Sequence, residues 1–386
     1  MRGHPGTGFD FDTIISRQGT SSLKWEKYRD RDVIPLWVAD MDFMSPPDVI
    51  EELKKRVDHG IFGYTVVPAE LVDTVIRTIK SEYAWVIEPD WIVWLPGLVS
   101  GLNVTCRAVG EHGDDVMTAV PVYPPFLTAP ALSGRNLIQV PLARDGRRYT
   151  FDFEGLSESV TNRTEIFILC NPHNPVGRVF SVEELQKLVD ICLDHGIILC
   201  SDEIHCGLVL DEDKKHVCVA GQFPEIAYRS ITLMAPSKTY NIPGLGCSFA
   251  VIPDAGLRKK FIRAKAGIVP DVNVLGYSGA LAAYGRSSQW REELLEYLRA
   301  NRDLVETYVG LMDTLNMSHV EATYLAWIDA RDLCSDPVSF FEDGGVGLSD
   351  GKYFGAEGFL RLNFGCPRPL LIEALERMNR ALMKRG

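Results

Sequence analysis

Lys238 is the lysine in this chain whose surroundings best suit nucleophilic chemistry. It follows the apolar run 231–235 and precedes the stretch 241–246, whereas most other lysines lie in polar or charged segments. A lysine lodged in a pocket loses solvation of its charge, so its pKa falls and its amine becomes nucleophilic. Such an amine can form a Schiff base with an aldehyde. The competing interpretation is a lysine that extends its ammonium from a strand end into water.

Two further polar groups follow neighbouring apolar runs. Asp202 comes soon after the run 197–200, and Asn174 lies in the proline-rich turn 171–177. A carboxylate at Asp202 can keep a ring nitrogen protonated, which makes the ring an electron sink, and the Asn174 amide can donate to a phenolic oxygen. Taken alone, Asp202 is better explained as a helix N-cap, and the turn can be an ordinary loop.

Four other residues suit either a flat ligand that carries a phosphate or a second ligand that carries a carboxylate. Tyr123 lies in the Pro121–Phe126 stretch and can stack on a flat ring, although a core aromatic is the simpler interpretation. Ser100 and Gly101 open an apolar helix, where free backbone N–H groups favour a phosphate. Arg361 alternates with apolar residues, so it is expected to be partly buried and to need an anion, either a bound carboxylate or a structural ion pair.

The elements that must position these groups alternate between strand and helix. The apolar runs 164–170, 197–200 and 231–235 are typical of buried strands, and a helix with a Ser181–Glu184 capping box follows the first. Such a pattern predicts a parallel sheet covered by helices on both faces. Ligands bind beyond the carboxyl ends of such strands, where these polar clusters converge.

The pattern changes after about residue 285. A long amphipathic helix is predicted at 291–312, a strand at 324–328 and a last helix from residue 369. We therefore predict a large domain over residues 44–285. Residues 1–43 and 286–386 are predicted to form a smaller α+β domain.

Composition excludes several classes of protein. The formal net charge is −12 and the longest basic runs are short, so neither nucleic acid nor an anionic membrane surface is an expected partner. No run is long and apolar enough to span a bilayer, and the polar start lacks the apolar core of a secretion signal. The nine cysteines show no CxxC pair or zinc spacing, so we expect free thiols, no metal and a cytoplasmic location.

Taken in order, these clusters resemble the pyridoxal-phosphate-dependent aminotransferases of class I/II, with fold type I. The resemblance covers nearly the whole chain and is greatest to the C–S β-lyase, or cystathionine β-lyase, branch. The motifs that carry it are the segments 34–43, 60–65, 121–126, 170–177, 201–205, 235–241 and 361–364. It implies an α/β large domain, with a mostly parallel sheet between helices, and a smaller α+β domain.

The resemblance also implies a role for each candidate residue. Lys238 would be the Schiff-base lysine and proton shuttle, and Arg361 would bind the α-carboxylate of an amino-acid substrate. Tyr64 would reach the phosphate bound by the other subunit of a homodimer. The remaining cofactor-binding residues would be Asp202, Asn174, Tyr123, His205, Ser100, Gly101 and Ser237.

The sequence departs from the family pattern at some positions. Cys206 and Gly207 stand where the branch usually has a small residue and an acid, Tyr240 where phenylalanine is frequent, and Gly246 where many aminotransferases have a phosphate-binding arginine. These changes bear on the substrate rather than on the cofactor.

The expected reaction is β-elimination from a cysteine thioether, which gives a thiol, pyruvate and ammonia. An aminotransferase is the alternative, because its first steps are the same. A non-catalytic binding protein on this fold and a dinucleotide oxidoreductase are the remaining alternatives. The conjunction of Lys238, Asp202 and Arg361 argues against the binding protein, since a pure binder has no need of the lysine.

Overall fold

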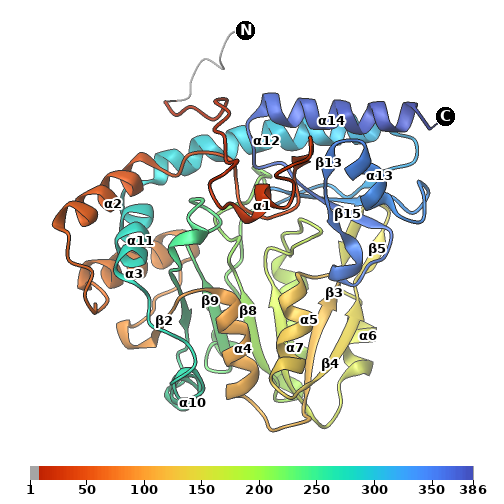
Figure 1. Ribbon diagram of the computed structural model, residues 1–386. Coiled ribbons are helices and arrows are strands. Elements are labelled where there is room, and N and C mark those ends of the chain that lie inside the picture. Colours follow the sequence, from red (N-terminus) through yellow and green to blue (C-terminus); the bar gives the residue numbers. More distant parts are fainter. Residues whose placement is uncertain (1–7, 386) are drawn as a thin grey trace.

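A seven-stranded sheet forms the centre of the larger part of the molecule. The computed structural model describes residues 8–385 and is shown in Figure 1. Neighbouring strands run parallel, except that β10 is antiparallel to both of its neighbours. The prediction of a mostly parallel sheet is therefore confirmed. In spatial order the strands are β2 (Ile92–Leu95), β10 (Ser248–Val251), β9 (Ser230–Met234), β8 (Ile198–Asp202), β7 (Thr164–Cys170), β3 (Asp115–Val120) and β4 (Asn136–Pro141).

Helices cover both faces of this sheet, as a buried parallel sheet requires. One face packs against α4 (Leu98–Ala108), α5 (Pro124–Leu132) and α10 (Ala255–Lys265), and Figure 1 shows α4 and α5 in front of the strands. The opposite face packs against α6 (Phe153–Ser159) and α7 (Val182–Asp194). The predicted capping box at the start of α7 is present, with Ser181 Oγ accepting from the Glu184 N–H and the Glu184 carboxylate accepting from the Ser181 N–H.

A second, antiparallel sheet lies towards the other end of the molecule. Its order is β11 (Asn316–Met317), β12 (Leu325–Asp329), β15 (Phe359–Asn363) and β14 (Ser349–Asp350). Its buried side chains pack with α12 (Ser288–Gly310) and α14 (Arg368–Met383), which run along the top of Figure 1. The predicted long helix, strand and last helix therefore exist, each with bounds shifted by a few residues.

The N-terminal segment joins this smaller part of the molecule. β1 (Ile34–Pro35) pairs in parallel with β13 (Val346–Gly347). The division at residues 43/44 and 285/286 stays a prediction. No helix in the described range 8–385 is long and apolar enough to cross a membrane.

Three helices flank the β2 edge of the large sheet on the left of Figure 1: α2 (Pro47–His59), α3 (Ala69–Tyr83) and α11 (Val274–Arg286). The segment 60–66 between α2 and α3 is mostly exposed. The remaining elements are short: α1 (Leu23–Glu26), η1 (Pro89–Trp91), β5 (Ala143–Asp145), β6 (Arg148–Thr150), α8 (Val219–Gln222), α9 (Pro224–Ala227), η2 (Pro243–Leu245), α13 (Pro337–Asp343) and η3 (Gly351–Phe354).

Candidate active site

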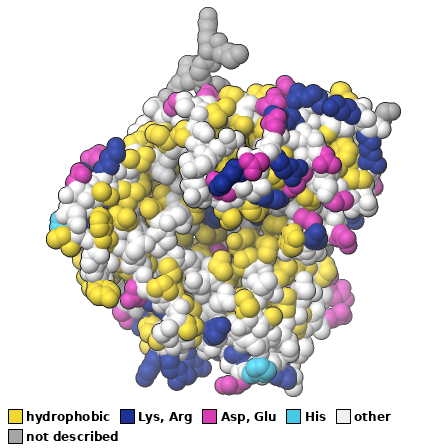
Figure 2. Space-filling model, viewed as in Figure 1, with side chains coloured by type: hydrophobic (Ala, Val, Ile, Leu, Met, Phe, Trp, Pro, Cys, Tyr) yellow, Lys and Arg dark blue, Asp and Glu magenta, His cyan; other side chains and the backbone are white. Residues whose placement is uncertain are grey.

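A cavity of about 170 Å³ lies at the carboxyl ends of β7, β8 and β9. This is where ligands bind to open α/β sheets, because the loops after the strands diverge there. The molecular face in Figure 2 is recessed near its centre, with hydrophobic side chains around the recess. Among the residues predicted from the sequence, the cavity is lined by Lys238, Asp202, Asn174, Tyr123, His205 and Ser237.

Lys238 follows β9, and its Nζ donates a hydrogen bond to the carbonyl oxygen of Ala39 at 2.6 Å. Burial, and then the nearby positive charge of Arg361, lower the pKa of the lysine to about 8. An amine with such a pKa is partly neutral near physiological pH, so it can act as a nucleophile or a base. The expected perturbed lysine is therefore present in the cavity.

Asp202 is the last residue of β8 and its side chain is buried. One carboxylate oxygen accepts the Ile204 N–H at 3.1 Å, within a turn rather than at the start of a helix. Burial raises the pKa of this carboxyl to about 7. Among the described residues no cation lies within 4.0 Å of it in an ion pair, so its second oxygen is free to accept from a ligand.

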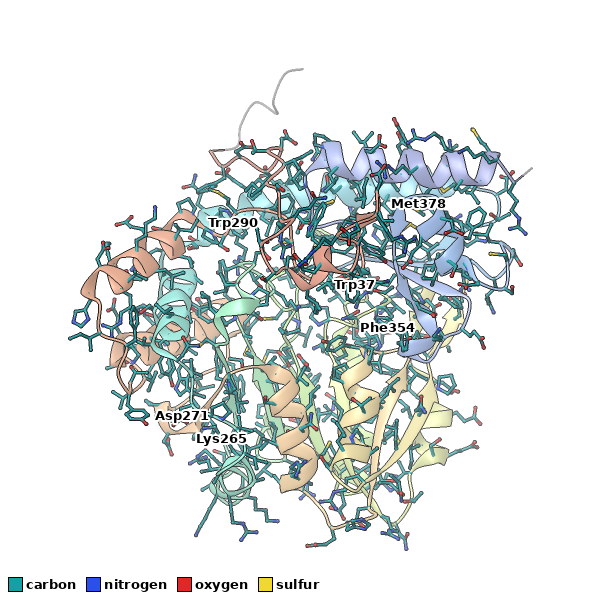
Figure 3. All side chains as sticks on the ribbon, viewed as in Figure 1. Trp37, Lys265, Asp271, Trp290, Phe354 and Met378 are labelled. Carbon is teal, nitrogen blue, oxygen red and sulfur yellow. The ribbon has the colours of Figure 1, made fainter. Side chains whose placement is uncertain are left out.

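Arg361 is buried in β15 and does not itself line the cavity, but it contacts Asn174 of the cavity wall. Its Nη1 donates to Asn174 Oδ1 at 3.1 Å and its Nη2 to the Trp37 carbonyl at 2.9 Å. The guanidinium also lies 4.6 Å from the centre of the Phe354 ring, and Figure 3 shows Trp37 and Phe354 near one another in the middle of the molecule. Within residues 8–385 no carboxylate pairs with Arg361, so the structural ion pair is not formed. Burial lowers the pKa of the guanidinium to about 10, and its Nε has no hydrogen-bond partner.

Tyr123 and His205 contribute the aromatic part of the wall. Tyr123 precedes α5, its N–H donates to the Asn174 carbonyl at 3.1 Å, and burial raises the pKa of its phenol. His205 is buried, and burial lowers the pKa of its ring to about 3, so the ring is neutral. Its Nδ1 has no partner among the described residues. A neutral imidazole of this kind can offer one hydrogen bond to a ligand.

The start of α4 forms another wall, but with residues different from those expected. Gly97, Leu98 and Val99 line the cavity, and the first N–H groups of a helix have no partner within the helix. Ser100 and Gly101 follow within the first turn, and a Cβ at Gly101 would lie 3.1 Å from Leu233 and Leu95 side chains. The role of Gly101 is thus to let the helix approach the sheet closely.

Tyr64 lies apart from this cavity. It is fully exposed in the 60–66 segment, together with the apolar side chains of Ile61, Phe62 and Val66. In this chain alone it contacts none of the other candidates.

The comparisons with known proteins agree with this geometry. Residues 31–378 match the family described as aminotransferase class I and II. The chain belongs to this family.

Within the class I and II aminotransferase family, several relatives cover almost the whole chain. Cystathionine beta-lyase PatB of Bacillus subtilis is 37% identical over 97% of this chain and 100% of its own. The crystal structure of OvoB is 45% identical and superposes with a TM-score of 0.95, covering 97% of this chain and 99% of that one. Cystalysin of Treponema denticola, whose structure contains pyridoxal 5′-phosphate, is 33% identical with a TM-score of 0.94, covering 98% and 100%. The fold is thus fold type I.

Two positions that depart from the family pattern, 207 and 246, have clear surroundings in this structure. A Cβ at Gly207 would lie 2.7 Å from Thr239 Oγ1 and 2.9 Å from its Cγ2, so Thr239 fills the space of a side chain there. Gly246 lines the cavity with φ +63 and carries no charge.

The residues predicted from the sequence do not include the side of the cavity formed by the N-terminal segment. Ala39 lines the cavity, and Tyr324 Oη donates to the same Ala39 carbonyl at 2.9 Å. The Trp37 carbonyl accepts hydrogen bonds from both Arg361 Nη2 and Ser349 Oγ, the latter at 2.7 Å, and so helps to fix the guanidinium. The signal available was the apolar segment 34–43, which supported the resemblance but received no local role.

Proposed function

We propose that this chain is a pyridoxal-phosphate-dependent carbon–sulfur β-lyase that cleaves cysteine thioethers, such as cystathionine, to a thiol, pyruvate and ammonia. The observation that carries the proposal is the buried Arg361, which has no carboxylate partner in the described chain and is hydrogen-bonded to Asn174 of the cavity that Lys238 lines. A buried cation without an anion suits a substrate carboxylate.

The donor set of the cavity fits pyridoxal phosphate. Asp202 is a buried carboxylate without a cation, as a partner for a pyridinium nitrogen should be. Asn174 has an amide whose Oδ1 is occupied by Arg361, which leaves its Nδ2 as a donor to the ring oxygen. His205 has an unpartnered Nδ1, Tyr123 offers an aromatic face, and the start of α4 offers N–H groups to the phosphate. When bound, this cofactor supplies a conjugated ring that takes up the electron pair left at Cα.

Three residues of the chain have separate roles in the proposed reaction. Arg361 binds the substrate carboxylate, and the Lys238 amine removes the Cα proton as a general base. Asp202 would keep the ring nitrogen of the bound cofactor protonated. The electron pair left at Cα forms a Cα–Cβ double bond as the Cβ–S bond breaks, and the electrons of that bond leave with sulfur as a thiolate, which is then protonated. After release the three-carbon product becomes an imine, and water breaks its C–N bond to give pyruvate and ammonia.

The names of the relatives support the lyase assignment. PatB is described as a cystathionine beta-lyase, and a structure 30% identical to this chain is described as a C-S lyase from Staphylococcus hominis. An aminotransferase remains the alternative and is separated by experiment, because its first proton transfer is the same.

We also propose a homodimer in which Tyr64 completes the site of the partner subunit, and a cytoplasmic location. The exposed apolar side chains of Ile61, Phe62, Tyr64 and Val66 support an interface at this segment, since such clusters on a folded surface mark contact sites.

The decisive experiment combines spectroscopy with product analysis. The visible spectrum of the purified protein is recorded, and L-cystathionine is added without a 2-oxo acid while pyruvate and free thiol are measured. Lys238→Ala is the test variant and Lys352→Ala, an exposed lysine, is its control. A pyridoxal band with both products from wild type and the control, but not from Lys238→Ala, is expected. A band with amino transfer only after a 2-oxo acid is supplied would make the protein an aminotransferase, and no band would exclude the cofactor.

A further inference from the structure

Residues 36–43, which we call the strap, contact both Lys238 and Arg361. On one side, Arg361 Nη2 donates to the Trp37 carbonyl at 2.9 Å. On the other, Lys238 Nζ donates to the Ala39 carbonyl at 2.6 Å. The strap backbone therefore contacts both groups on which the proposed reaction depends.

Asn363 holds the first half of the strap. It follows Arg361 by two residues on β15 and is fully buried. Its Nδ2 donates to the Val38 carbonyl at 2.5 Å and to the Asp40 carbonyl at 2.7 Å, and its Oδ1 accepts the Gly365 N–H at 2.8 Å. The two carbonyls on either side of residue 39 are thus bound to one amide.

Asn241 holds the second half in the same manner. It follows Lys238 by three residues, and its φ of +53 lies in the left-handed region that asparagine tolerates. Its Nδ2 donates to the Met41 carbonyl at 3.0 Å and to the Phe43 carbonyl at 2.8 Å, while its Oδ1 accepts the Met41 N–H at 3.0 Å. The strap is thereby attached to the lysine loop.

We propose that Asn241 and Asn363 are a pair of positioning residues, which hold the strap between the lysine loop and the arginine strand and so align the two halves of the site. This inference rests on the proposed function. Neither asparagine lines the cavity, and both atoms of each side-chain amide are already hydrogen-bonded to backbone groups. Each therefore acts through the strap carbonyls rather than on substrate or cofactor. A displacement of about 1 Å at such groups can reduce the rate about 100-fold.

Asn301 provides a matched control. It is also fully buried, and its Nδ2 donates to the Phe364 and Cys366 carbonyls at 3.0 and 2.9 Å. It therefore resembles Asn363 in burial and hydrogen bonding but does not touch the strap. A variant at Asn301 shows what the loss of a buried amide alone does.

The test compares Asn241→Gly, Asn363→Ser, their double variant and Asn301→Ser. Glycine keeps the left-handed backbone at residue 241, so only the amide is removed. We expect amide hydrogen exchange of the strap to accelerate in the first three variants of the cofactor-free protein. In the holoenzyme kcat/KM should fall about 10- to 100-fold, mainly through kcat in Asn241→Gly and mainly through KM in Asn363→Ser. The double variant should lose less than the product of the single losses, because both side chains hold one segment.

Strap exchange and kcat/KM unchanged within about twofold in both single variants would overturn the inference, and so would equal losses in Asn301→Ser. Thermal unfolding of all variants separates a general loss of stability from a local one. If wild type gives no thiol or pyruvate, the proposed function is wrong. The role of the asparagines is still decided by hydrogen exchange of the strap and by the rate at which the cofactor-free variants bind pyridoxal phosphate at Lys238.

Discussion

The Arg361 guanidinium donates to the side-chain oxygen of Asn174 at 3.1 Å, which joins β15 of the smaller sheet to the turn after β7 of the larger one. One end of the Asn174 amide is therefore fixed by the arginine, and the other end is left to donate into the cavity. The same bond couples Arg361, the proposed carboxylate-binding residue, to Asn174 in the cavity, so a change at either residue should affect both groups.

Asn174→Asp should convert this contact into an ion pair. The new carboxylate would compete with the substrate carboxylate for Arg361, and the donor to the ring oxygen would be lost. Charge-assisted bonds contribute about 1.5–3 kcal/mol, so kcat/KM should fall at least 10- to 100-fold, with much of the loss in KM. Steady-state kinetics with L-cystathionine checks this, with the exposed Asn316→Asp as the control. An unchanged KM would show that the arginine does not bind the carboxylate.

The rate of cofactor capture by Lys238 should follow the ionisation of its amine. Its pKa is lowered to about 8, so the rate at which the pyridoxal band appears should rise with pH, reach half its maximum near pH 8 and level off at higher pH. Arg361→Gln should move this midpoint upward, since the arginine charge lowers the lysine pKa, and Asp202→Asn should move it downward. Stopped-flow mixing of cofactor-free protein with pyridoxal phosphate measures the midpoint. A midpoint above 10 in wild type would mean that the lysine is solvated.

Asp202 should weaken the cofactor-free fold at neutral pH. Its carboxyl binds a proton more tightly in the folded chain, where the pKa is about 7, than in the unfolded chain, where it is 3.8. The free energy of unfolding therefore falls as pH rises through this window, by at most about 1.4 kcal/mol per pKa unit. The cofactor-free Asp202→Asn variant should melt higher than wild type at pH 8 and equally at pH 4. With cofactor bound the order at pH 8 should reverse, and thermal unfolding with and without cofactor tests both statements.

A site shared between subunits can be tested by mixing two inactive variants. Tyr64→Ala should bind the cofactor too weakly to be active, and Lys238→Ala should be inactive because it lacks the reactive amine. In a hybrid dimer, the Lys238→Ala subunit would supply an intact Tyr64 to the site that retains its lysine. Activity should therefore return partly after the two variants are unfolded and refolded together, but not after each is refolded alone. No recovery, with hybrids present by mass spectrometry, would place Tyr64 outside the partner's site.

Gly207→Ala should destabilise the fold by about 1–3 kcal/mol, because its Cβ would overlap Thr239. The threonine follows the catalytic lysine directly, so kcat should fall as well. Thr239→Ala should restore most of the lost stability in the double variant, since it removes the two closest atoms. Denaturant unfolding of the four proteins in this cycle measures the coupling. Additive effects would show that the two positions do not share space.

The features predicted well from the sequence are those fixed by neighbouring residues. The strand 164–170 has the predicted bounds, because its apolar run ends at a proline turn and no competing pattern adjoins it. The apolar runs before Lys238 and Asp202 correctly predict these residues at the cavity, because each residue comes where a strand ends. At the start of α4 the cavity is lined by residues 97–99 rather than by Ser100 and Gly101, because Gly101 packs on the sheet, and a phosphate-binding role for this helix start stays a prediction.

The strap could not be predicted from such patterns. Its contacts use backbone carbonyls, which every residue carries, and its partners are distant in sequence. The Lys238 bond to Ala39 spans 199 residues, and the asparagines that hold the strap have no local motif that would show their function. Tyr64 was expected at the partner's site through resemblance alone, and the described chain leaves it exposed.

The contacts of the strap also bear on the order in which parts of the site form while the protein is synthesised. Its residues leave the ribosome early, but the amide that binds Val38 is 325 residues further along the chain. The contacts of Lys238 and Asn241 with the strap do not need β15, but those of Arg361 and Asn363 form only after this strand has been made. Completion of the site is therefore a late step. A chain truncated before β15 would keep Lys238 but would lack Arg361 and the amide that holds the first half of the strap.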